Sequence, residues 1–141
     1  MNDSPNFFWG QSMDFGQAIK TCLNKYATFS GRAQRSEYWY FFLFMMIVNI
    51  VASVLDSAIF EDLPIFSILA TLALLVPSIS VSVRRLHDTD RSGWWLLLGF
   101  IPVVGVIVLI VFFCHRGTVD SNQFGPDPLQ GSISSSHTAR A

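Results

Sequence analysis

The hydrophobic positions of this chain gather in three long runs that contain no charged residue. The runs are Tyr38–Leu55, Leu63–Val83 and Gly93–Cys114. Because a helix rises about 1.5 Å per residue, a run of about 20 residues matches the ~30 Å hydrocarbon core of a bilayer. The pattern therefore predicts three membrane-spanning helices, over about 38–56, 63–83 and 93–114.

A shorter amphipathic segment precedes the first run. Its apolar side chains recur at helical spacing and are Phe15, Ile19, Cys22, Leu23 and Tyr26. Asp14 or Ser12 is a suitable N-cap for this helix. A short helix with a basic polar face just before a span favours a position in the membrane interface, with packing on a partner protein as the alternative. The expected fold is an all-α membrane protein, with three transmembrane helices preceded by an amphipathic interfacial helix.

The remaining residues are too few for a second folded domain. We expect an irregular N-terminus over residues 1–12 and a single membrane domain over 13–128. The Ser-rich tail over 129–141 is expected to be disordered.

Two prolines interrupt the apolar runs, Pro77 in the second and Pro102 in the third. Each removes a backbone hydrogen bond and is expected to kink its helix. Gly99 and Gly105 flank Pro102, which raises the alternative of a re-entrant hairpin. Two complete crossings need ~40 residues, however, so one kinked span over 93–114 is favoured.

Composition and charge support a membrane protein and set its expected orientation. Charged residues make up 13% of the chain, about half of the ~25% usual in soluble domains. The net charge of −1 gives no basic excess for nucleic acid, and none is expected as a partner. Lys and Arg near span ends stay on the cytoplasmic side. The basic residues before the first span and within Arg84–Ser92 therefore predict a cytoplasmic N-terminus, an outer loop at 57–62 and an outer C-terminus, with Arg116 as the exception.

Polar residues form a stripe on each of the first two runs. Asn49, Ser53 and Asp56 share one helical face, and Ser67, Thr71, Ser78, Ser82 and Arg85 share another. Polar side chains in lipid turn toward neighbouring helices, so the stripes are expected to meet. In an antiparallel pair Asn49 reaches the depth of Thr71, where a hydrogen bond is worth about 0.6–2 kcal/mol. The alternative is that the stripes line a polar path.

A basic cluster is expected at the inner face. Its candidate lipid- or partner-binding residues are Arg32, Arg35, Arg84, Arg85 and Arg91, and the acidic members of its polar network are Glu37, Asp88 and Asp90. Arg–carboxylate pairs fix geometry, which favours a structural anchor. Basic clusters also attract anionic lipid. His87, Asp88 and Asp90 suggest a metal or acid/base site, but no second ligand group accompanies them, so no metal, cofactor or catalysis is expected.

Several blocks of this sequence resemble one known family. They are Phe29-Ser30-Gly31-Arg32-Ala33-Gln34-Arg35-Ser36-Glu37-Tyr38-Trp39, Arg84-Arg85-Leu86-His87-Asp88-Thr89-Asp90-Arg91-Ser92-Gly93-Trp94-Trp95, Pro102, Gly105, Gly117, Asn122, Phe124-Gly125 and Asp127-Pro128. The chain resembles, from about Phe15 to Pro128, the bacterial inner-membrane proteins called domain of unknown function 805, or YhaH-like proteins. The resemblance implies a small protein of the bacterial inner membrane and supplies no activity and no catalytic residue.

Three function classes follow in order of preference. The first is a non-enzymatic binding or assembly module in the inner membrane, whose inner Arg/Asp girdle engages anionic lipid or a partner protein. The second is a subunit of an oligomeric transporter or channel. The third, an enzyme, would require a metal bound at His87. Because thin helices bury little surface alone, a homo-oligomer or a membrane protein partner is plausible.

Overall fold

The computed structural model describes residues 13–61 and 63–129, and this part of the chain is helical. In chain order the elements are α2 (Phe15–Asn24), α3 (Arg35–Ile59), α4 (Ile65–Asp88), the 3₁₀ helix η1 (Gly93–Phe100) and α5 (Val104–Cys114). The predicted irregular N-terminus lies outside the described residues, as does the Ser-rich tail beyond Leu129.

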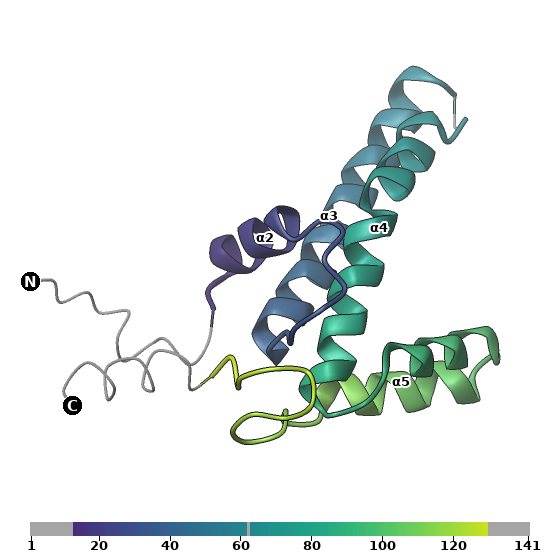
Figure 1. The fold of residues 1–141 in the computed structure, drawn as a ribbon. Helices are drawn as coiled ribbons and strands as arrows, with labels where there is room; N and C mark the ends of the chain where they lie inside the picture. The colour runs from purple at the N-terminus through teal and green to yellow at the C-terminus, as the bar shows by residue number, and fades with distance from the viewer. Residues whose placement is uncertain (1–12, 62, 130–141) are drawn as a thin grey trace, which may run out of the picture.

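The long helices α3 and α4 form an antiparallel pair, which is the axis of the molecule (Figure 1). Both are long and apolar enough to cross a membrane, with a mean hydropathy of 2.1 in their most apolar stretch. Within those stretches 11% and 17% of the residues are buried, whereas a helix in a soluble core hides most of its apolar side chains. The first two apolar runs therefore form helices of the predicted kind. We call the end at Ile59 and Ile65 the far end, and the end at Arg35 and Asp88 the near end.

Polar groups join α3 to α4 at the far end and midway along the pair. The Asp56 carboxylate accepts hydrogen bonds from the backbone N–H groups of Phe66 (2.7 Å) and Ser67 (3.0 Å) and from the Ser67 hydroxyl (2.7 Å). Thr71 Oγ1 donates to Asn49 Oδ1 at 3.1 Å, which confirms the predicted contact between these two residues.

The serines of the α4 stripe that lie nearer to the near end donate within their own helix. Ser78 donates to the Leu75 carbonyl and Ser82 to the Ser78 carbonyl, and Ser82 also interacts with the Tyr38 side chain of α3. Ser53 is exposed on α3. The predicted meeting of the two polar stripes is therefore confirmed at two side-chain pairs, Asn49–Thr71 and Asp56–Ser67.

Helix α2 packs beside the near-end half of the pair. It begins in a capping box, in which Asp14 Oδ1 accepts from the Gln17 N–H (2.8 Å) and the Gln17 side chain accepts from the Asp14 N–H (3.1 Å). Its apolar face buries Ala18 and Cys22. The predicted amphipathic helix is thus confirmed with Asp14 as its cap, while its position in a membrane interface stays a prediction.

The third apolar run differs from its prediction. Instead of one kinked helix over 93–114, η1 runs outward, the chain turns at Ile101–Val103, and α5 returns against η1. We call Gly93–Cys114 the apolar hairpin. With 11 residues, α5 is about 17 Å long, roughly half of a ~30 Å hydrocarbon core. The predicted single kinked helix over 93–114 is therefore replaced by two short helices, and three transmembrane helices are not confirmed.

The backbone at the turn explains why the run folds back. Val103, next to Pro102, has φ of 64°, a left-handed conformation that ends a helix. Gly105 packs so closely that a Cβ there would lie 1.7 Å from the Leu98 carbonyl oxygen. The sequence favours one span because two complete crossings of the bilayer need ~40 residues. Two short helices that turn back on each other do not need that length.

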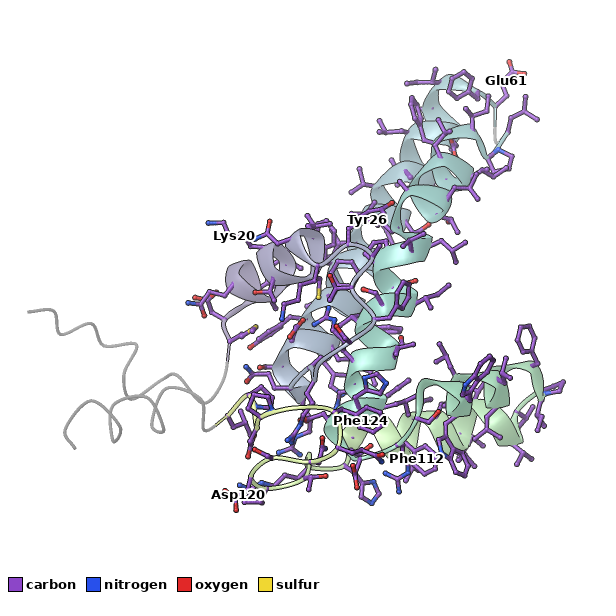
Figure 2. The ribbon with its side chains drawn as sticks, in the orientation of Figure 1. Lys20, Tyr26, Glu61, Phe112, Asp120 and Phe124 are labelled. Carbon is purple, nitrogen blue, oxygen red and sulfur yellow. The ribbon has the colours of Figure 1, made fainter. Side chains whose placement is uncertain are left out.

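The two ends of the α3–α4 pair are surrounded differently. Figure 1 shows α2 and the apolar hairpin on opposite sides of the near-end half. Neither of them covers the far-end half, which we call the bare half. Figure 2 places Glu61 at the far tip and Asp120 and Phe124 toward the near end. The segment after α5 thus runs along the near end up to Leu129. The structure therefore differs from the expectation that the chain leaves the third run at the end opposite to its start, while the side of the membrane stays a prediction.

Candidate functional site

A buried ion network lies at the C-terminal end of α4. Asp88 Oδ1 accepts from Arg32 Nε at 3.0 Å, and Asp88 Oδ2 accepts from Arg85 Nη1 at 2.6 Å. The side chains of all three residues are at most 3% exposed. One carboxylate thus holds two guanidinium groups away from water, and Asp127, 3.9 Å from Arg32 Nη2, adds a second negative charge.

A second buried pair lies one turn up α4, under α2. Arg84 Nη1 is 2.5 Å from Glu37 Oε2, and both side chains are almost completely buried. The Cys22 thiol of α2 donates to the same carboxylate oxygen at 3.6 Å. Burial, reinforced by the Glu37 charge, raises the pKa of Cys22 to about 12, so this thiol stays protonated. Arg84 Nε and Nη2 have no hydrogen-bond partner among the described residues.

Arg32 also holds the segment that follows α5. Its Nη1 donates to the carbonyls of Asp120 (2.7 Å) and Gly125 (3.3 Å), and its Nη2 donates to the Thr118 carbonyl. The Thr118 N–H donates to the Asp88 carbonyl at 2.7 Å. A Cβ at Gly117 would lie 2.0 Å from Asp88 Oδ2, so a glycine is needed for this segment to pass the network.

Three arginine N–H groups, together with Trp39 Nε1, which donates to the Phe113 carbonyl at 3.3 Å, fasten the C-terminal end of α5 to the near end. Arg85 Nε donates to the Phe113 carbonyl at 3.1 Å and Arg85 Nη2 to the His115 carbonyl. Arg35 Nη1 donates to the Cys114 carbonyl at 3.3 Å. The last carbonyls of a helix have no partner within the helix and carry partial negative charge, so cationic donors suit them.

His87 serves as a packing surface rather than as a member of a ligand group. Its ring stacks on Phe124 with centroids 4.0 Å apart and planes 1° apart, and its Nδ1 is 2.9 Å from the Gly31 carbonyl oxygen. Asp90 is exposed with φ of 61° and takes part in no ion pair among the described residues. The structure thus brings Asp88 and Glu37 into the predicted polar network and leaves Asp90 outside it.

The five arginines predicted to bind a lipid or partner divide into two groups. Arg32, Arg84 and Arg85 are buried and paired with the protein's own carboxylates. Arg35 is exposed, and Arg91 is half-buried with its guanidinium 4.0 Å from the centre of the Phe112 ring. The first group stabilises the fold, and the second still presents charge at the surface.

Sequence reasoning missed the residues that complete the network from the C-terminal side. These are Asp127 and the carbonyl groups of Phe113, His115, Thr118, Asp120 and Gly125. Backbone acceptors carry no side-chain signature. The available signal was the family pattern Gly117, Phe124-Gly125 and Asp127, which lies in this same segment.

Comparison with known proteins places the chain in a family. Residues 26–126 match the family described as "Protein of unknown function (DUF805)". Inner membrane protein YhaI of Escherichia coli (strain K12) is 49% identical over 110 residues, which cover 78% of this chain and 93% of YhaI. Inner membrane protein YhaH of the same strain is 44% identical over 110 residues, which cover 75% and 91% of the two chains. No solved structure matches. This chain, with its buried arginine network and two long apolar helices, belongs to the DUF805 family, whose function is unknown.

Proposed function

We propose that this chain is a non-enzymatic, multi-pass protein of the bacterial inner membrane that acts as a binding or assembly module through its near end. Support for the location comes from the relatives YhaI and YhaH, which are named inner membrane proteins, and from two helices long enough to cross a bilayer. The ligand of the module is anionic phospholipid, and a partner protein that carries the same charge is the alternative.

The near end faces the cytoplasm in this proposal. The loop between α3 and α4 carries Glu61 and Asp62 and no basic residue. Because the apolar hairpin folds back, Arg116 lies at the same end as Arg35 and Arg91, and the one conflict with the positive-inside rule disappears.

One observation carries the assignment of the ligand. Three guanidinium groups that have no carboxylate partner among the described residues gather at the C-terminal end of α5. Arg35 donates to the Cys114 carbonyl, Arg91 lies on the Phe112 ring, and Arg116 is exposed two residues beyond Cys114. Each basic residue near a membrane surface contributes about 1 kcal/mol to the attraction of anionic lipid. The buried arginines cannot contribute in this way because the protein neutralises them itself.

Native mass spectrometry of the purified full-length chain tests the proposal. Detergent micelles are supplied with equal amounts of phosphatidylglycerol and phosphatidylcholine, and the bound lipids are counted. We expect several-fold more phosphatidylglycerol than phosphatidylcholine. The triple variant Arg35→Gln, Arg91→Gln, Arg116→Gln should lose this preference, while the control Lys20→Gln, Lys25→Gln should keep most of it. A wild-type chain without any preference would contradict the proposal.

A second candidate, a subunit of an oligomeric transporter or channel, has one observation in its favour. This observation is an open groove of about 210 Å³ on the far-end half of α4, whose lining includes Ser67 and Thr71. A larger open groove, of about 370 Å³, lies on the apolar hairpin. The hydroxyls of Ser67 and Thr71 both donate to α3, and small polar side chains of this kind also let a helix of a neighbouring copy approach closely. A flux assay in proteoliposomes decides this candidate, because a pore must pass ions or solutes in at least one oligomeric state.

A further inference from the structure

We propose that the apolar hairpin is a re-entrant membrane segment, which enters and leaves the lipid at the near end and is covered by acyl chains of one leaflet. This inference rests on the proposed function, because it names the surface that meets the acyl chains of the anionic lipid. The near end would then contact one leaflet in two ways. Its arginines would contact the lipid headgroups, and the apolar hairpin would contact the acyl chains.

The first argument is the character of the hairpin surface. No charged residue occurs between Gly93 and Cys114, and apolar side chains point outward along the whole hairpin. Trp94 is 78% exposed, Phe100 83% and Val103 70%. Helix α2 shows the contrast, because it has one polar face as a helix at the water boundary requires. The hairpin has no such face, so it needs an apolar cover on every side.

The second argument is that the turn supplies internal partners for three of its backbone N–H groups, although the Val103 N–H has none among the described residues. The Ile101 N–H donates to the Leu98 carbonyl (2.9 Å), the Val104 N–H to the Pro102 carbonyl (2.7 Å) and the Gly105 N–H to the Ile101 carbonyl (3.2 Å). Proline has no N–H to satisfy. In hydrocarbon an unsatisfied N–H costs several kcal/mol, and a turn with internal partners for these amides suits that solvent. Figure 1 shows the hairpin projecting sideways from the foot of α4, at a large angle to the α3–α4 pair, so it would run within one leaflet rather than along the two crossing helices.

The third argument favours lipid over a second copy of the chain as the partner that covers the apolar hairpin. Arg35, Arg91 and Arg116 surround the base of the hairpin, and Asp90 is the exposed carboxylate nearest to them in the sequence. Two hairpins packed base to base would bring two sets of like charges together. Anionic headgroups above acyl chains complement both parts of this surface.

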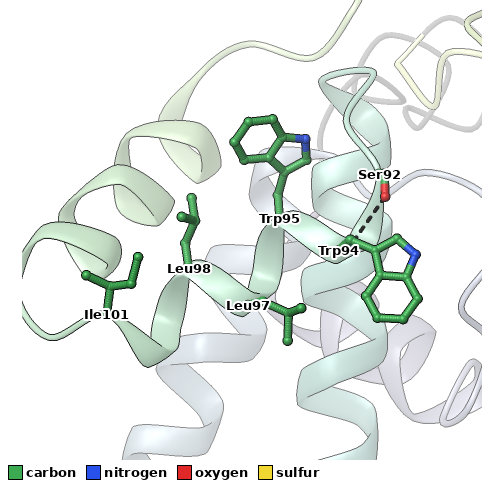
Figure 3. Close-up of a pocket in the computed structure, with 6 residues that line it drawn as sticks. All are labelled: Ser92, Trp94, Trp95, Leu97, Leu98 and Ile101. Atoms are coloured by element: carbon green, nitrogen blue, oxygen red, sulfur yellow. Dashed lines mark hydrogen bonds between the residues drawn. The ribbon is translucent and has the colours of Figure 1, made fainter.

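A groove on η1 gives the acyl chains a specific place. It is open, has a volume of about 370 Å³, and is lined by Ser92, Trp94, Trp95, Leu97, Leu98 and Ile101 (Figure 3). Figure 3 shows both tryptophan rings at the end of the hairpin next to Ser92, whose hydroxyl caps η1 through the Trp94 N–H at 3.1 Å. Tryptophan is enriched at the level of lipid headgroups, which matches the base of the hairpin and leaves its tip for the hydrocarbon.

Site-directed spin labelling in proteoliposomes tests the inference. The full-length chain, with Cys114→Ser to leave only the buried Cys22, carries a nitroxide at Phe100→Cys, at Leu97→Cys or at His115→Cys. Phosphatidylcholine vesicles with a third of phosphatidylglycerol are the membrane. Collision with oxygen reports the acyl region, and collision with a water-soluble nickel chelate reports the aqueous phase. Ile50→Cys, on the bare half of α3, is the matched control for a lipid-facing position.

We expect the label at residue 100 to favour oxygen severalfold over the nickel chelate, as the control does, with residue 97 intermediate and residue 115 close to the headgroups. A label at residue 100 that meets the nickel chelate freely would place the hairpin in water and overturn the inference. A label that neither reagent reaches would show a protein cover, such as a second copy, and would overturn it equally. Lipid counting on the unlabelled chain is independent, so loss of the phosphatidylglycerol preference alone would reject the proposed ligand and leave the re-entrant hairpin standing.

Discussion

The near end and the far end of the α3–α4 pair both use a buried carboxylate, and they neutralise it in opposite ways. At the far end the N–H groups and hydroxyl of the α4 N-terminus surround Asp56. At the near end the guanidinium groups of Arg32 and Arg85 surround Asp88. A helix N-terminus supplies donors and partial positive charge, so a carboxylate there needs no cation. A helix C-terminus supplies carbonyl acceptors, and arginine satisfies these together with the carboxylate.

This difference explains why the basic residues of the described chain gather at one end. The far loop closes without a Lys or Arg, and so it meets the requirement for a segment that crosses to the outer side. The near end joins α3, α4, α5 and the segment up to Leu129 through arginines, of which Arg32 and Arg85 each bridge several acceptors and Arg35 contacts one. The charges that hold the near end together therefore lie where the proposed orientation places the cytoplasmic side.

The largest expected effect comes from removing the shared carboxylate. Asp88→Asn removes the carboxylate paired with Arg85 and leaves Arg32 with only the more distant Asp127 among the described residues, and breaking a buried ion pair costs about 3–5 kcal/mol. Titration with dodecyl sulfate in mixed micelles, followed by circular dichroism, measures this loss in the free energy of unfolding. Asp90→Asn is the matched control, and it should change stability by less than about 0.5 kcal/mol, as surface substitutions usually do. Equal effects of the two substitutions would contradict the assigned network.

A smaller loss of stability is expected when a side-chain atom is added where η1 and α5 pack closely together. Gly105→Ala places a Cβ against the Leu98 carbonyl, and overpacking of this kind costs about 1–3 kcal/mol. Gly99→Ala is the control, because its Cβ meets only Leu109 at an ordinary 3.6 Å. The same dodecyl sulfate titration distinguishes them. If Gly105→Ala were as stable as Gly99→Ala, the apolar run would not fold back in the described way.

The smallest effect belongs to the bare half of the pair. The hydrogen bond from Thr71 to Asn49 joins the side chains of α3 and α4 midway along the pair, and such bonds in lipid are worth about 0.6 kcal/mol. A double-mutant cycle with Asn49→Leu and Thr71→Val should return a coupling of that size. A coupling above about 2 kcal/mol would mean that the bare half, rather than the charged end, holds the two helices together.

Much of this fold could be predicted from the sequence because its signals are local. Uninterrupted apolar runs gave α3 and α4, helical spacing with a cap at Asp14 gave α2, and the antiparallel register gave the contact between Asn49 and Thr71. The pairing of Glu37 and Asp88 with arginines followed from the complementary charge and geometry of carboxylate and guanidinium groups. Each of these inferences needs only a period, a length or a complementary charge.

The fold of the third run could not be predicted in the same way. Periodicity and length show that Gly93–Cys114 is apolar and helical, but they do not show its direction after Pro102. The deciding facts are a left-handed Val103 and a close approach at Gly105, which arise only when both halves are in place. The hydrogen-bond partners of Arg85 could not be predicted for a related reason. Arg85 donates to backbone carbonyls of α5 and of His115, and these acceptors have no side-chain signature.

The most direct test of the account is the side of the membrane on which the chain after α5 lies. Two paired reporters, alkaline phosphatase and green fluorescent protein, are fused after Leu129 in one set of proteins that keep all three apolar runs, and are inserted beside Glu61 in another set. A hairpin fastened by Arg32 and Arg85 predicts a cytoplasmic signal after Leu129 and an extracytoplasmic signal at Glu61. Extracytoplasmic signals at both positions would show that the third apolar run crosses the bilayer, and would contradict the account.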